Sequence, residues 1–338
     1  MNKFKHFLGI DISKEFFDAV IILDGKKEQS THNQFRNNAT GLKGLCKWLK
    51  ELDATSENTL ICLEHTGMYG KLVIKHLLSF GFSLWVEMSL KIIRSIGMQR
   101  GKNDKVDAFR IAYYAMKNAD EAIVYKAPRK VIEKIRILLS VRDKLIQYKG
   151  SLLRHTNELK SFDAELFKLS TNHQKNAIKG FDKDLKNIEN QLNLLIKEDE
   201  ALNTIYTQAT SVPGIGKITT LALICFTNEF KMYSTPRQLA CYSGVAPFEY
   251  SSGKSIRAKP RVNNMANKKL KKQLHMCALA AATYDPELNL YYQRKVEENK
   301  NKLLILNNVK NKLIHRICAC IRENRTYQIK PQIEFVSL

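Results

Sequence analysis

The chain has 338 residues, and its 55 lysines and arginines against 33 aspartates and glutamates give a formal charge of +22 at pH 7. With 44% hydrophobic and 9% aromatic residues, the composition excludes disorder over most of the chain and, at roughly 150 residues per domain, predicts two domains and a connector. Because no lipidation motif or membrane helix is recognisable, the positive charge favours nucleic acid over an anionic membrane as the partner.

The N-terminal and cysteine patterns restrict the compartment. Asp11 interrupts the first apolar run before a signal-peptide core of roughly 7–15 residues can form, and no run of about 18 uncharged apolar residues follows. The seven cysteines are scattered and contain no Cys-x-x-Cys pair, which disfavours a disulfide framework or a zinc site. We therefore expect a soluble, cytoplasmic protein.

Residues 1–128 predict an α/β domain. Two β-rich runs, Phe7–Ser13 and Phe16–Leu23, flank a tight connection and predict a hairpin, with a candidate third strand at Gln34–Asn37. Helices and strands then alternate: a helix at Thr40–Leu52, a strand at Thr59–Glu64, a helix at Leu72–Phe80 and a strand at Ser83–Glu87. This alternation indicates a layered α/β fold.

Residues 129–206 predict a helical coiled-coil connector. Apolar residues recur there every seven residues or in steps of three and four, at Leu138, Leu145, Leu152, Leu159 and Leu166 and then at Ile178, Phe181, Leu185, Ile188, Leu192 and Leu195. A break at Leu169–His173 predicts that the two helices fold back as an antiparallel pair. The same seams could instead pair between subunits, and an ordinary helical bundle without an oligomerising role stays open.

Residues 207–325 predict a mostly α-helical domain, and residues 326–338 predict a tail. Strand signals stop after Pro128, so the Pro-, Ser- and Gly-rich segment Pro247–Pro260 is expected to interrupt the helices as a loop.

Four carboxylates are placed where they could meet. Asp11 and Glu64 each end a predicted strand, while Asp104 and Asp107 lie three residues apart at the start of a predicted helix, where positions i and i+3 share a face. Like charges within a few ångströms repel and raise one another's pKa unless a cation neutralises them, so such a cluster favours a Mg²⁺ site. Two such ions can assist phosphodiester cleavage.

Each of these carboxylates also has a simpler interpretation. A strand-terminal aspartate is often a turn former, Asp104 could cap its helix, and Asp107 could interact favourably with the helix dipole. The Gly-Ile-Asp motif followed by serine also opens actin-like ATPase domains, so by itself it does not favour a nuclease over a kinase. The set of four together favours the metal site.

Three segments carry a family resemblance: Gly9–Lys14, Glu64–Gly70 and Lys102–Ala108. With them the chain resembles the IS110 type of DEDD transposases, a family similar to the pilin-gene invertases. The resemblance implies a ribonuclease H-like first domain similar to the Holliday-junction resolvase RuvC. It also implies that the four acidic positions of the family are filled by Asp11, Glu64, Asp104 and Asp107.

In the third domain the resemblance implies a serine nucleophile. The family places a serine in a Pro-x-x-x-x-Ser-Gly segment, which here begins at Pro247 and gives Ser252, with Ser251 as the nearest alternative. From the residues alone, a serine in a Ser-Gly loop is usually a turn residue. In the family's reaction the hydroxyl attacks a DNA phosphate and forms a phosphoserine link, with the metal-bound carboxylates stabilising the developing charge. The first and third domains would then have to meet.

Val212–Gly216 resembles the hairpin of a helix-hairpin-helix motif. Its glycines, Gly214 and Gly216, would let backbone N–H groups approach a DNA phosphate beside Lys217 and a helix N-terminus. An ordinary glycine-rich helix connection is the alternative. The family commonly has glycine where Ala266 stands, and this departure concerns the loop before the next helix.

The densest basic stretch contains eight basic residues and no acidic one: Lys254, Arg257, Lys259, Arg261, Lys268, Lys269, Lys271 and Lys272. On a helix, Lys268, Lys271 and Lys272 share a face that could follow a phosphate backbone, and each neutralised phosphate would add roughly 0.9 to the salt dependence of binding to duplex DNA. A solvated helix face is the alternative.

These patterns together predict an insertion-sequence transposase or site-specific DNA recombinase that uses Mg²⁺ and a serine nucleophile. The resemblance further implies that a structured non-coding guide RNA encoded by the element selects donor and target DNA, and that the protein works as a homodimer or tetramer. Two alternatives stay open: a hydrolytic, RuvC-like junction nuclease in which Ser252 is idle, and an inactive nucleic-acid-binding remnant.

Overall fold

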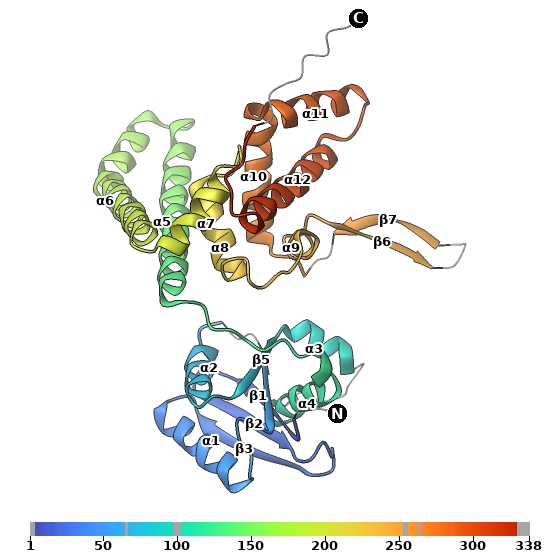
Figure 1. The fold of residues 1–338 in the computed structure, drawn as a ribbon. Helices are drawn as coiled ribbons and strands as arrows, with labels where there is room; N and C mark the ends of the chain where they lie inside the picture. The colour runs from blue at the N-terminus through green and yellow to red at the C-terminus, as the bar shows by residue number, and fades with distance from the viewer. Residues whose placement is uncertain (1–3, 65–66, 97–102, 253–255, 263–264, 330–338) are drawn as a thin grey trace, which may run out of the picture. The chain divides into compact units, whose positions relative to one another are not determined.

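The chain divides into two compact units, residues 1–127 and 128–338. The structure is a computed structural model that describes residues 4–64, 67–96, 103–252, 256–262 and 265–329 (Figure 1). Within these ranges, no helix is both long and apolar enough to cross a membrane. The finer division into a connector at 129–206, a third domain at 207–325 and a tail stays a prediction.

A five-stranded mixed sheet forms the centre of the first unit. Its strands are β1 (His6–Ile12), β2 (Phe16–Ile22), β3 (Ser30–Arg36), β4 (Thr59–Glu64) and β5 (Ser83–Glu87). Their spatial order is β3-β2-β1-β4-β5; β2 runs antiparallel to β1 and β3, whereas β4 runs parallel to β1 and β5. The predicted hairpin, the third strand and the two later strands are confirmed.

Helices cover both faces of this sheet. They are α1 (Ala39–Glu51), α2 (Gly70–Ser79), α3 (Ser89–Ile96) and α4 (Asp104–Lys117), followed by the short 3-10 helix η1 (Ala119–Glu121). Ile10 of β1 belongs to the apolar cluster formed with α1 and α2, while Phe7 belongs to the cluster formed with α3 and α4. Side chains alternate along a strand, so the central strands are buried on both faces.

Gly9 lets α4 approach the sheet more closely than any side chain would permit. A Cβ atom built on Gly9 would lie 2.2 Å from the Ala108 carbonyl oxygen and 2.2 Å from the Ala112 nitrogen, both in the backbone of α4. These distances are far inside van der Waals contact, so only glycine fits here. The contact fixes the start of α4 beside the end of β1, two residues before Asp11.

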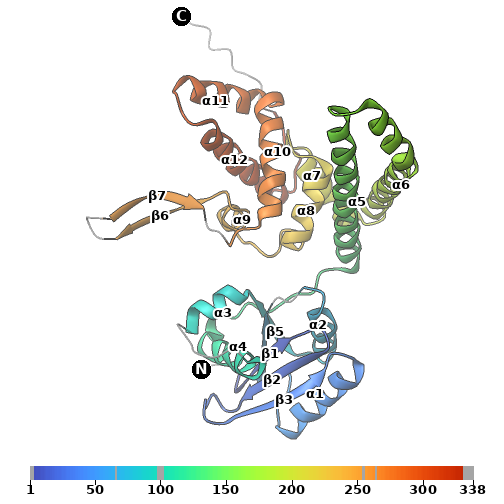
Figure 2. The same ribbon diagram turned by 180° about the vertical axis from the view of Figure 1, so that it is seen from behind.

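The second unit is mainly helical (Figures 1 and 2). Its helices are α5 (Lys130–Lys160), α6 (Ala164–Lys197), α7 (Glu200–Thr210), α8 (Lys217–Thr227), α9 (Pro236–Tyr242), α10 (Lys268–Tyr284), α11 (Pro286–Glu297) and α12 (Lys302–Arg322). Its core includes α10 and α12, where Leu274 and Leu313 are fully buried. The structure confirms the coarse fold class that the sequence predicts, a mixed α/β first unit followed by a mostly helical remainder.

The two long helices α5 and α6 form an antiparallel pair, but the predicted break between them is wrong. The turn lies at residues 161–163, where the Asp163 side chain caps α6 by accepting from the Glu165 and Leu166 N–H groups. Leu169–His173 is helical instead. Ser170 accepts from Gln174 Nε2 one turn further along α6, in keeping with a continuous helix. The coiled-coil character of the pair stays a prediction.

The expected loop at Pro247–Pro260 is also wrong, because β6 (Pro247–Ser252) and β7 (Ile256–Val262) form an antiparallel hairpin there. Phe248 pairs with Arg261, and Tyr250 pairs with Ala258, so the register shifts between them. Pro260 lies at this irregularity, where a strand can tolerate the missing N–H group. Pro247 and Pro260 made the segment resemble a loop in the sequence, although both lie within strands.

Replacing Gly9 with alanine should disrupt the first unit. Because the added methyl group meets backbone atoms that cannot rotate away, we expect Gly9→Ala to cost about 3 kcal/mol or more of unfolding free energy. The matched control is Gly180→Ala in α6, where a Cβ atom would have no neighbour within 4 Å. This substitution should stabilise the helix by about 0.5–1 kcal/mol. Denaturant titration followed by circular dichroism measures both, and equal effects of the two substitutions would contradict the close contact at Gly9.

Candidate active site

Acidic side chains form a row across one end of the sheet. Asp11 of β1 pairs with Asp18 of β2, and Glu64 of β4 pairs with Glu87 of β5. Ile10 pairs with Leu63 in the parallel β1–β4 ladder, so Asp11 and Glu64 follow as neighbours on these two strands. Residues opposite one another in a ladder point to the same face, and this face is the one covered by α4.

Asp11 lies at the centre of this row in an environment that opposes its negative charge. Burial raises the pKa of its carboxyl group, and the neighbouring charges of Glu64, Asp107 and Asp104 raise it further, to about 6. The Ile12 N–H group donates to the same carboxylate and acts in the opposite direction. The four acidic residues predicted from the sequence therefore do interact electrostatically in the folded chain.

The first turn of α4 supplies two of these carboxylates. Asn103 caps the helix, because its side-chain oxygen accepts from the Lys105 N–H group at 3.0 Å. The alternative that Asp104 caps the helix is therefore wrong, and Asp104 is exposed. Asp107 is half-buried and pairs with Arg110, with 2.6 Å between its Oδ1 and the guanidinium Nη1. Negative charge in the first helical turn is also favoured by the helix dipole.

Glu64 is held from α3. The Ser89 hydroxyl donates to Glu64 Oε2 at 2.6 Å, so the first residue of α3 orients this carboxylate at the end of β4. His65, the residue that follows, lies outside the described residues. The serine binds only one carboxylate oxygen of Glu64, Oε2.

The two carboxylates at the ends of the row, Asp18 and Glu87, were not predicted from the sequence. Asp18 is only 5% exposed, and it accepts from Gln34 Nε2 at 3.0 Å and contacts His32 Nε2 at 2.7 Å. Glu87 accepts from the Tyr114 hydroxyl at 3.3 Å and pairs with Lys91 at 2.9 Å. Glu87 ends a buried strand just as Glu64 does, so the same signal could have found it. Both carboxylates already have partners.

The donor set fits a hard divalent cation, although the side chains do not converge on one point. Among the residues that the structure describes, no three His, Cys, Asp or Glu side chains lie close enough together to hold a metal ion. The chemistry nevertheless fits, because carboxylate oxygens are the preferred ligands of such ions and the repulsion that raises the Asp11 pKa is what a cation would relieve. Asp11, Glu64, Asp104 and Asp107 would hold it.

The predicted serine lies at the end of β6 in the second unit. Ser251 and Ser252 are its last two residues, and their backbones pair with Arg257 and Ile256 of β7. Gly253 and the predicted phosphate ligand Lys254 lie outside the described residues. Ser252 is thus the last residue of a strand.

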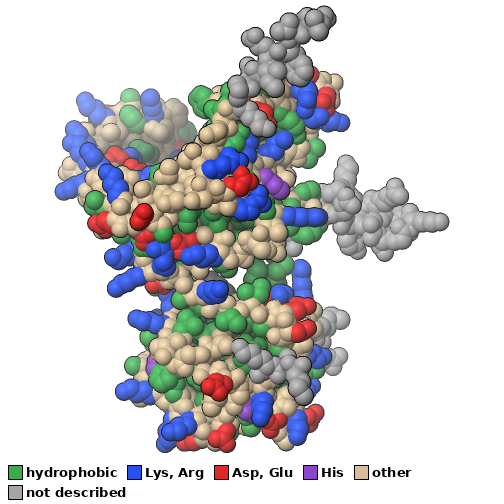
Figure 3. Space-filling model, in the orientation of Figure 1, with side chains coloured by type: hydrophobic (Ala, Val, Ile, Leu, Met, Phe, Trp, Pro, Cys, Tyr) green, Lys and Arg blue, Asp and Glu red, His purple; other side chains and the backbone are tan. Residues whose placement is uncertain are grey.

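The predicted basic residues are distributed over two elements. Arg257, Lys259 and Arg261 occupy alternate positions of β7. Lys268 and Lys272 are exposed in the first turns of α10, whereas Lys271 is half-buried. Figure 3 shows that other lysines and arginines are spread over the visible surface of both units.

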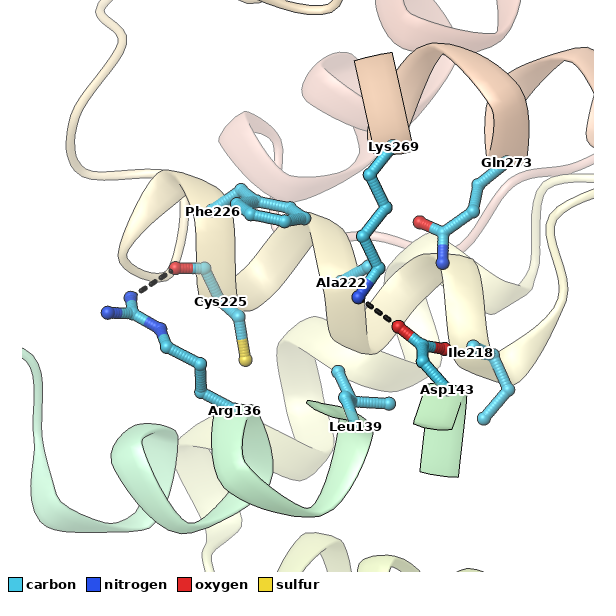
Figure 4. Close-up of a pocket in the computed structure, with 9 residues that line it drawn as sticks. All are labelled: Arg136, Leu139, Asp143, Ile218, Ala222, Cys225, Phe226, Lys269 and Gln273. Atoms are coloured by element: carbon cyan, nitrogen blue, oxygen red, sulfur yellow. Dashed lines mark hydrogen bonds and ion pairs between the residues drawn. The ribbon is translucent and has the colours of Figure 1, made fainter. Parts of the chain in front are cut away.

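Lys269 is exposed but already has a protein partner. It forms an ion pair with Asp143 of α5 (Figure 4). The pair borders a cavity of about 30 Å³, lined by Arg136, Leu139, Asp143, Ile218, Ala222, Cys225, Phe226, Lys269 and Gln273. This volume holds about one or two water molecules, so the cavity cannot hold a nucleotide.

The glycine-rich connection between α7 and α8 packs tightly inside the second unit. Gly214 has a φ of +88°, and a Cβ atom there would lie 2.7 Å from the Cys277 carbonyl oxygen of α10. Lys217 donates to Asn193 and to the Glu189 carbonyl oxygen of α6, and burial lowers its pKa. Gly216 has no atom within 4 Å of such a Cβ position. Gly214 and Lys217 thus have structural contacts that support the alternative of an ordinary helix connection.

Comparison with known proteins identifies the family. A DEDD transposase model of the IS110 type matches residues 8–166, and the model of the transposase IS116/IS110/IS902 family matches residues 206–293. The chain belongs to the IS110 family of transposases. The first match includes the four predicted acidic residues, Asp11, Glu64, Asp104 and Asp107. The second includes Ser252 and the basic stretch up to Lys272.

Two curated relatives match this IS110 transposase over almost their whole length. The pilin gene-inverting proteins of Moraxella bovis and Moraxella lacunata are each 25% identical to it over 328 residues, which cover 96% of this chain and 98% of theirs. A 43.6 kDa protein of insertion element IS110 from Streptomyces coelicolor is 29% identical over 141 residues, 42% of this chain and 34% of that one. The transposase is accordingly a DNA recombinase, an enzyme with DNA as substrate, and DEDD transposases typically use a divalent metal ion.

The raised pKa of Asp11 has a consequence for the metal-free transposase. A carboxyl group whose folded pKa is raised contributes stability at low pH, and this contribution is lost as the pH rises through about 6. Asp11→Asn should therefore stabilise the protein at pH 8 by about 1–2 kcal/mol, a value reduced for its partial exposure, with no gain below about pH 4. Thermal denaturation with EDTA at both pH values measures this.

The exposed Asp120 provides the matched control for this experiment, since Asp120→Asn should have little effect at either pH. Added Mg²⁺ should raise the melting temperature of the unmodified transposase and leave that of Asp11→Asn nearly unchanged. A stability loss of the same size at pH 8 and at low pH would show that Asp11 is a structural residue and contradict its assignment to a cation site.

Proposed function

We propose that this IS110 transposase cuts and rejoins DNA with Ser252 as nucleophile, using Mg²⁺ held by Asp11, Glu64, Asp104 and Asp107. The observation that carries the proposal is the electrostatic environment of Asp11, whose carboxyl pKa is raised by acidic groups of β4 and α4. A cation among these groups would remove the repulsion, and an all-carboxylate donor set favours Mg²⁺.

The first unit is proposed to be a ribonuclease H-like domain similar to RuvC. The sheet order β3-β2-β1-β4-β5, with an antiparallel meander followed by two parallel strands, supports this assignment. In this arrangement the central strand carries Asp11 and its parallel neighbour carries Glu64. A helix-hairpin-helix at Val212–Gly216 has weaker support, because Gly214 and Lys217 are engaged by α10 and α6.

In the proposed reaction the Ser252 hydroxyl attacks the phosphorus of a DNA phosphodiester. A serine O–P bond forms, one deoxyribose O–P bond breaks, and the released sugar takes up a proton as a free hydroxyl while the serine proton passes to solvent. A bound divalent ion would stabilise the charge that develops on the phosphate oxygens. Attack by a second sugar hydroxyl on the phosphoserine reverses these steps and joins new strands, so no net bond energy is lost.

We further propose that the substrates are element ends and target DNA, chosen by a structured guide RNA, and that the active form is a homodimer or tetramer. The charge of +22 supports binding to more than one nucleic-acid strand. The Moraxella relatives are named for inverting a pilin gene, which supports a site-specific exchange of DNA segments by this chain as well.

Ser252→Ala should abolish the covalent protein–DNA product and reduce strand exchange at least a thousandfold, because no other group forms the phosphoserine link. The purified transposase is incubated with Mg²⁺ and labelled element-end DNA, and the product is trapped by denaturation and gel electrophoresis. Ser251→Ala is the matched control, one position earlier in β6, and should keep the covalent product.

The outcomes separate this mechanism from its rivals. Unaltered cleavage by Ser252→Ala would support the hydrolytic, junction-resolving nuclease, in which water is the attacking group. Loss of the link in Ser251→Ala alone would transfer the role to that serine. Failure of the intact transposase to break DNA with Mg²⁺ and its RNA present would support the inactive remnant.

If a guide RNA selects the target, a change in the RNA sequence should change the DNA sequence at which recombination occurs. When the segment of the element's non-coding transcript that pairs with target DNA is rewritten, recombination should move to the newly complementary sequence, since base pairing and not protein contacts would select it. Deep sequencing of the junctions measures this. Junctions that stay at the original site would contradict RNA guidance without affecting the assignment of Ser252.

A further inference from the structure

α12 carries a lysine on its buried side. Lys310 is 5% exposed and lies among the core residues Leu306 and Leu313, one turn away in either direction. Among the described residues, its ammonium group has no hydrogen-bond or ion-pair partner, yet it is not one of the fully buried unpartnered polar atoms, so the stem is buried while Nζ reaches solvent. Buried lysines are normally paired with a carboxylate, so the charge of Lys310 lacks the compensation that the fold usually provides.

The surroundings of Lys310 are basic. α10 and α12 pack together, and the positive charge of Lys271 on α10 adds to burial in lowering the pKa of Lys310. Lys271 itself passes close to Gly244, because its Cδ atom lies 3.3 Å from the place where a Cβ atom on Gly244 would be. Two lysines from different helices are therefore close enough for the charge of one to act on the other.

Both lysines border the loop that leads into the β6–β7 hairpin. Asn307, one turn before Lys310 on the same face of α12, donates its Nδ2 to the Val245 carbonyl oxygen at 2.7 Å. Gly244, beside Lys271, is the preceding residue and has a φ of +65°. Pro247, the first residue of β6, follows two residues after Val245. The fold thus places the turns of α10 and α12 that carry these lysines beside the base of the hairpin.

A largely buried lysine that has no carboxylate partner and lies near a second cation lowers the stability of the free protein. A methionine or leucine at position 310 would fill the same space between Leu306 and Leu313 without a desolvation cost. An anion that binds both ammonium groups removes this cost. A phosphodiester suits such a pair because it is a compact monoanion with two unshared acceptor oxygens, and its chain offers one at each nucleotide.

We propose that Lys271 and Lys310 together bind one backbone phosphate of the nucleic-acid substrate at the base of the β6–β7 hairpin. The inference rests on the proposed function, since DNA supplies the anion, and it adds a positioning site to it. Ser252 lies five residues further along β6, about 16 Å at the usual rise of a strand. A phosphate held at the hairpin base would therefore set the register of the DNA strand relative to the hairpin.

The test compares DNA binding by single and double variants of the full-length protein. Binding of a fluorescein-labelled element-end duplex is followed by anisotropy over a series of salt concentrations for Lys310→Met, Lys271→Met and the double variant. Each single variant should bind several-fold more weakly and lower the salt slope by about 0.9. Because one phosphate is shared, the double variant should lose less than the product of the two single losses.

Lys302→Met is the matched control, since Lys302 is an exposed lysine at the start of the same helix and should leave the slope almost unchanged. Melting temperature without DNA separates binding from folding. Lys310→Met should melt at the same or a higher temperature than the unmodified protein, whereas a lysine with a purely structural role would leave a less stable protein when replaced.

An unchanged salt slope in Lys310→Met would overturn the site. So would a lower melting temperature of Lys310→Met combined with normal DNA binding by Lys271→Met. A double variant whose loss of affinity equals the product of the two single losses would also overturn it. If the unmodified protein cleaves and rejoins DNA while Lys310→Met behaves normally, the phosphate site alone is wrong. If the unmodified protein does not bind the duplex at all, the proposed function fails together with the site.

Discussion

The contact between Gly9 and the backbone of α4 determines how closely the acidic first turn of α4 approaches the acidic row of the sheet. Without a side chain at this point, the peptide groups of Ala108 and Ala112 rest directly on β1. The first turn of α4, with Asp104 and Asp107, is thereby brought to the strand that ends in Asp11 two residues later. A layer separation typical of bulkier residues would carry the helix away from the sheet and weaken the electrostatic coupling that raises the Asp11 pKa.

The acidic row combines charges that oppose one another with charges that are already compensated. Asp18 and Glu87, at the two flanks, are held by His32, Gln34, Tyr114 and Lys91. Asp11, in the middle, has three acidic neighbours and only a backbone N–H group in its favour. Such an imbalance costs stability and is characteristic of groups that are kept for binding or chemistry and not for folding. The partners of the flanking residues confine the imbalance to the centre of the sheet.

Much of the first unit could be predicted because its signals are local. Strands such as Thr59–Glu64 are short apolar runs between turn residues, and their bounds in the structure match the prediction. Asp11 and Glu64 could be identified as candidates because each ends such a run. Asp18 could not, because a carboxylate in the middle of a strand becomes noticeable only when the register places it opposite Asp11 and supplies Gln34 from β3 as its partner.

The second unit was harder to predict where tertiary contacts override local preferences. The prolines of the β6–β7 hairpin are typical of a loop, but pairing across the ladder and an irregularity near Pro260 accommodate them in a strand. The polar run Leu169–His173 is typical of a turn, yet Asp163 caps α6 earlier and Thr156 bonds to Gln174 across the two helices. Lys217 was assigned to DNA through the helix-hairpin-helix resemblance and Lys269 as part of a dense basic stretch. Only the folded chain reveals their partners.

The α5–α6 hairpin is anchored at one end only. Its buried apolar contacts gather where Ile132 and Leu139 meet Leu192 and Leu195 with α7 and α8. Between Leu139 and Ile188, a stretch that the structure describes throughout, Thr156 is the only buried residue. An arm built in this way can gain or lose whole helical turns at its tip without disturbing the core from which it projects. Related recombinases could therefore differ in arm length, and so in the reach of this element, while keeping the same catalytic framework.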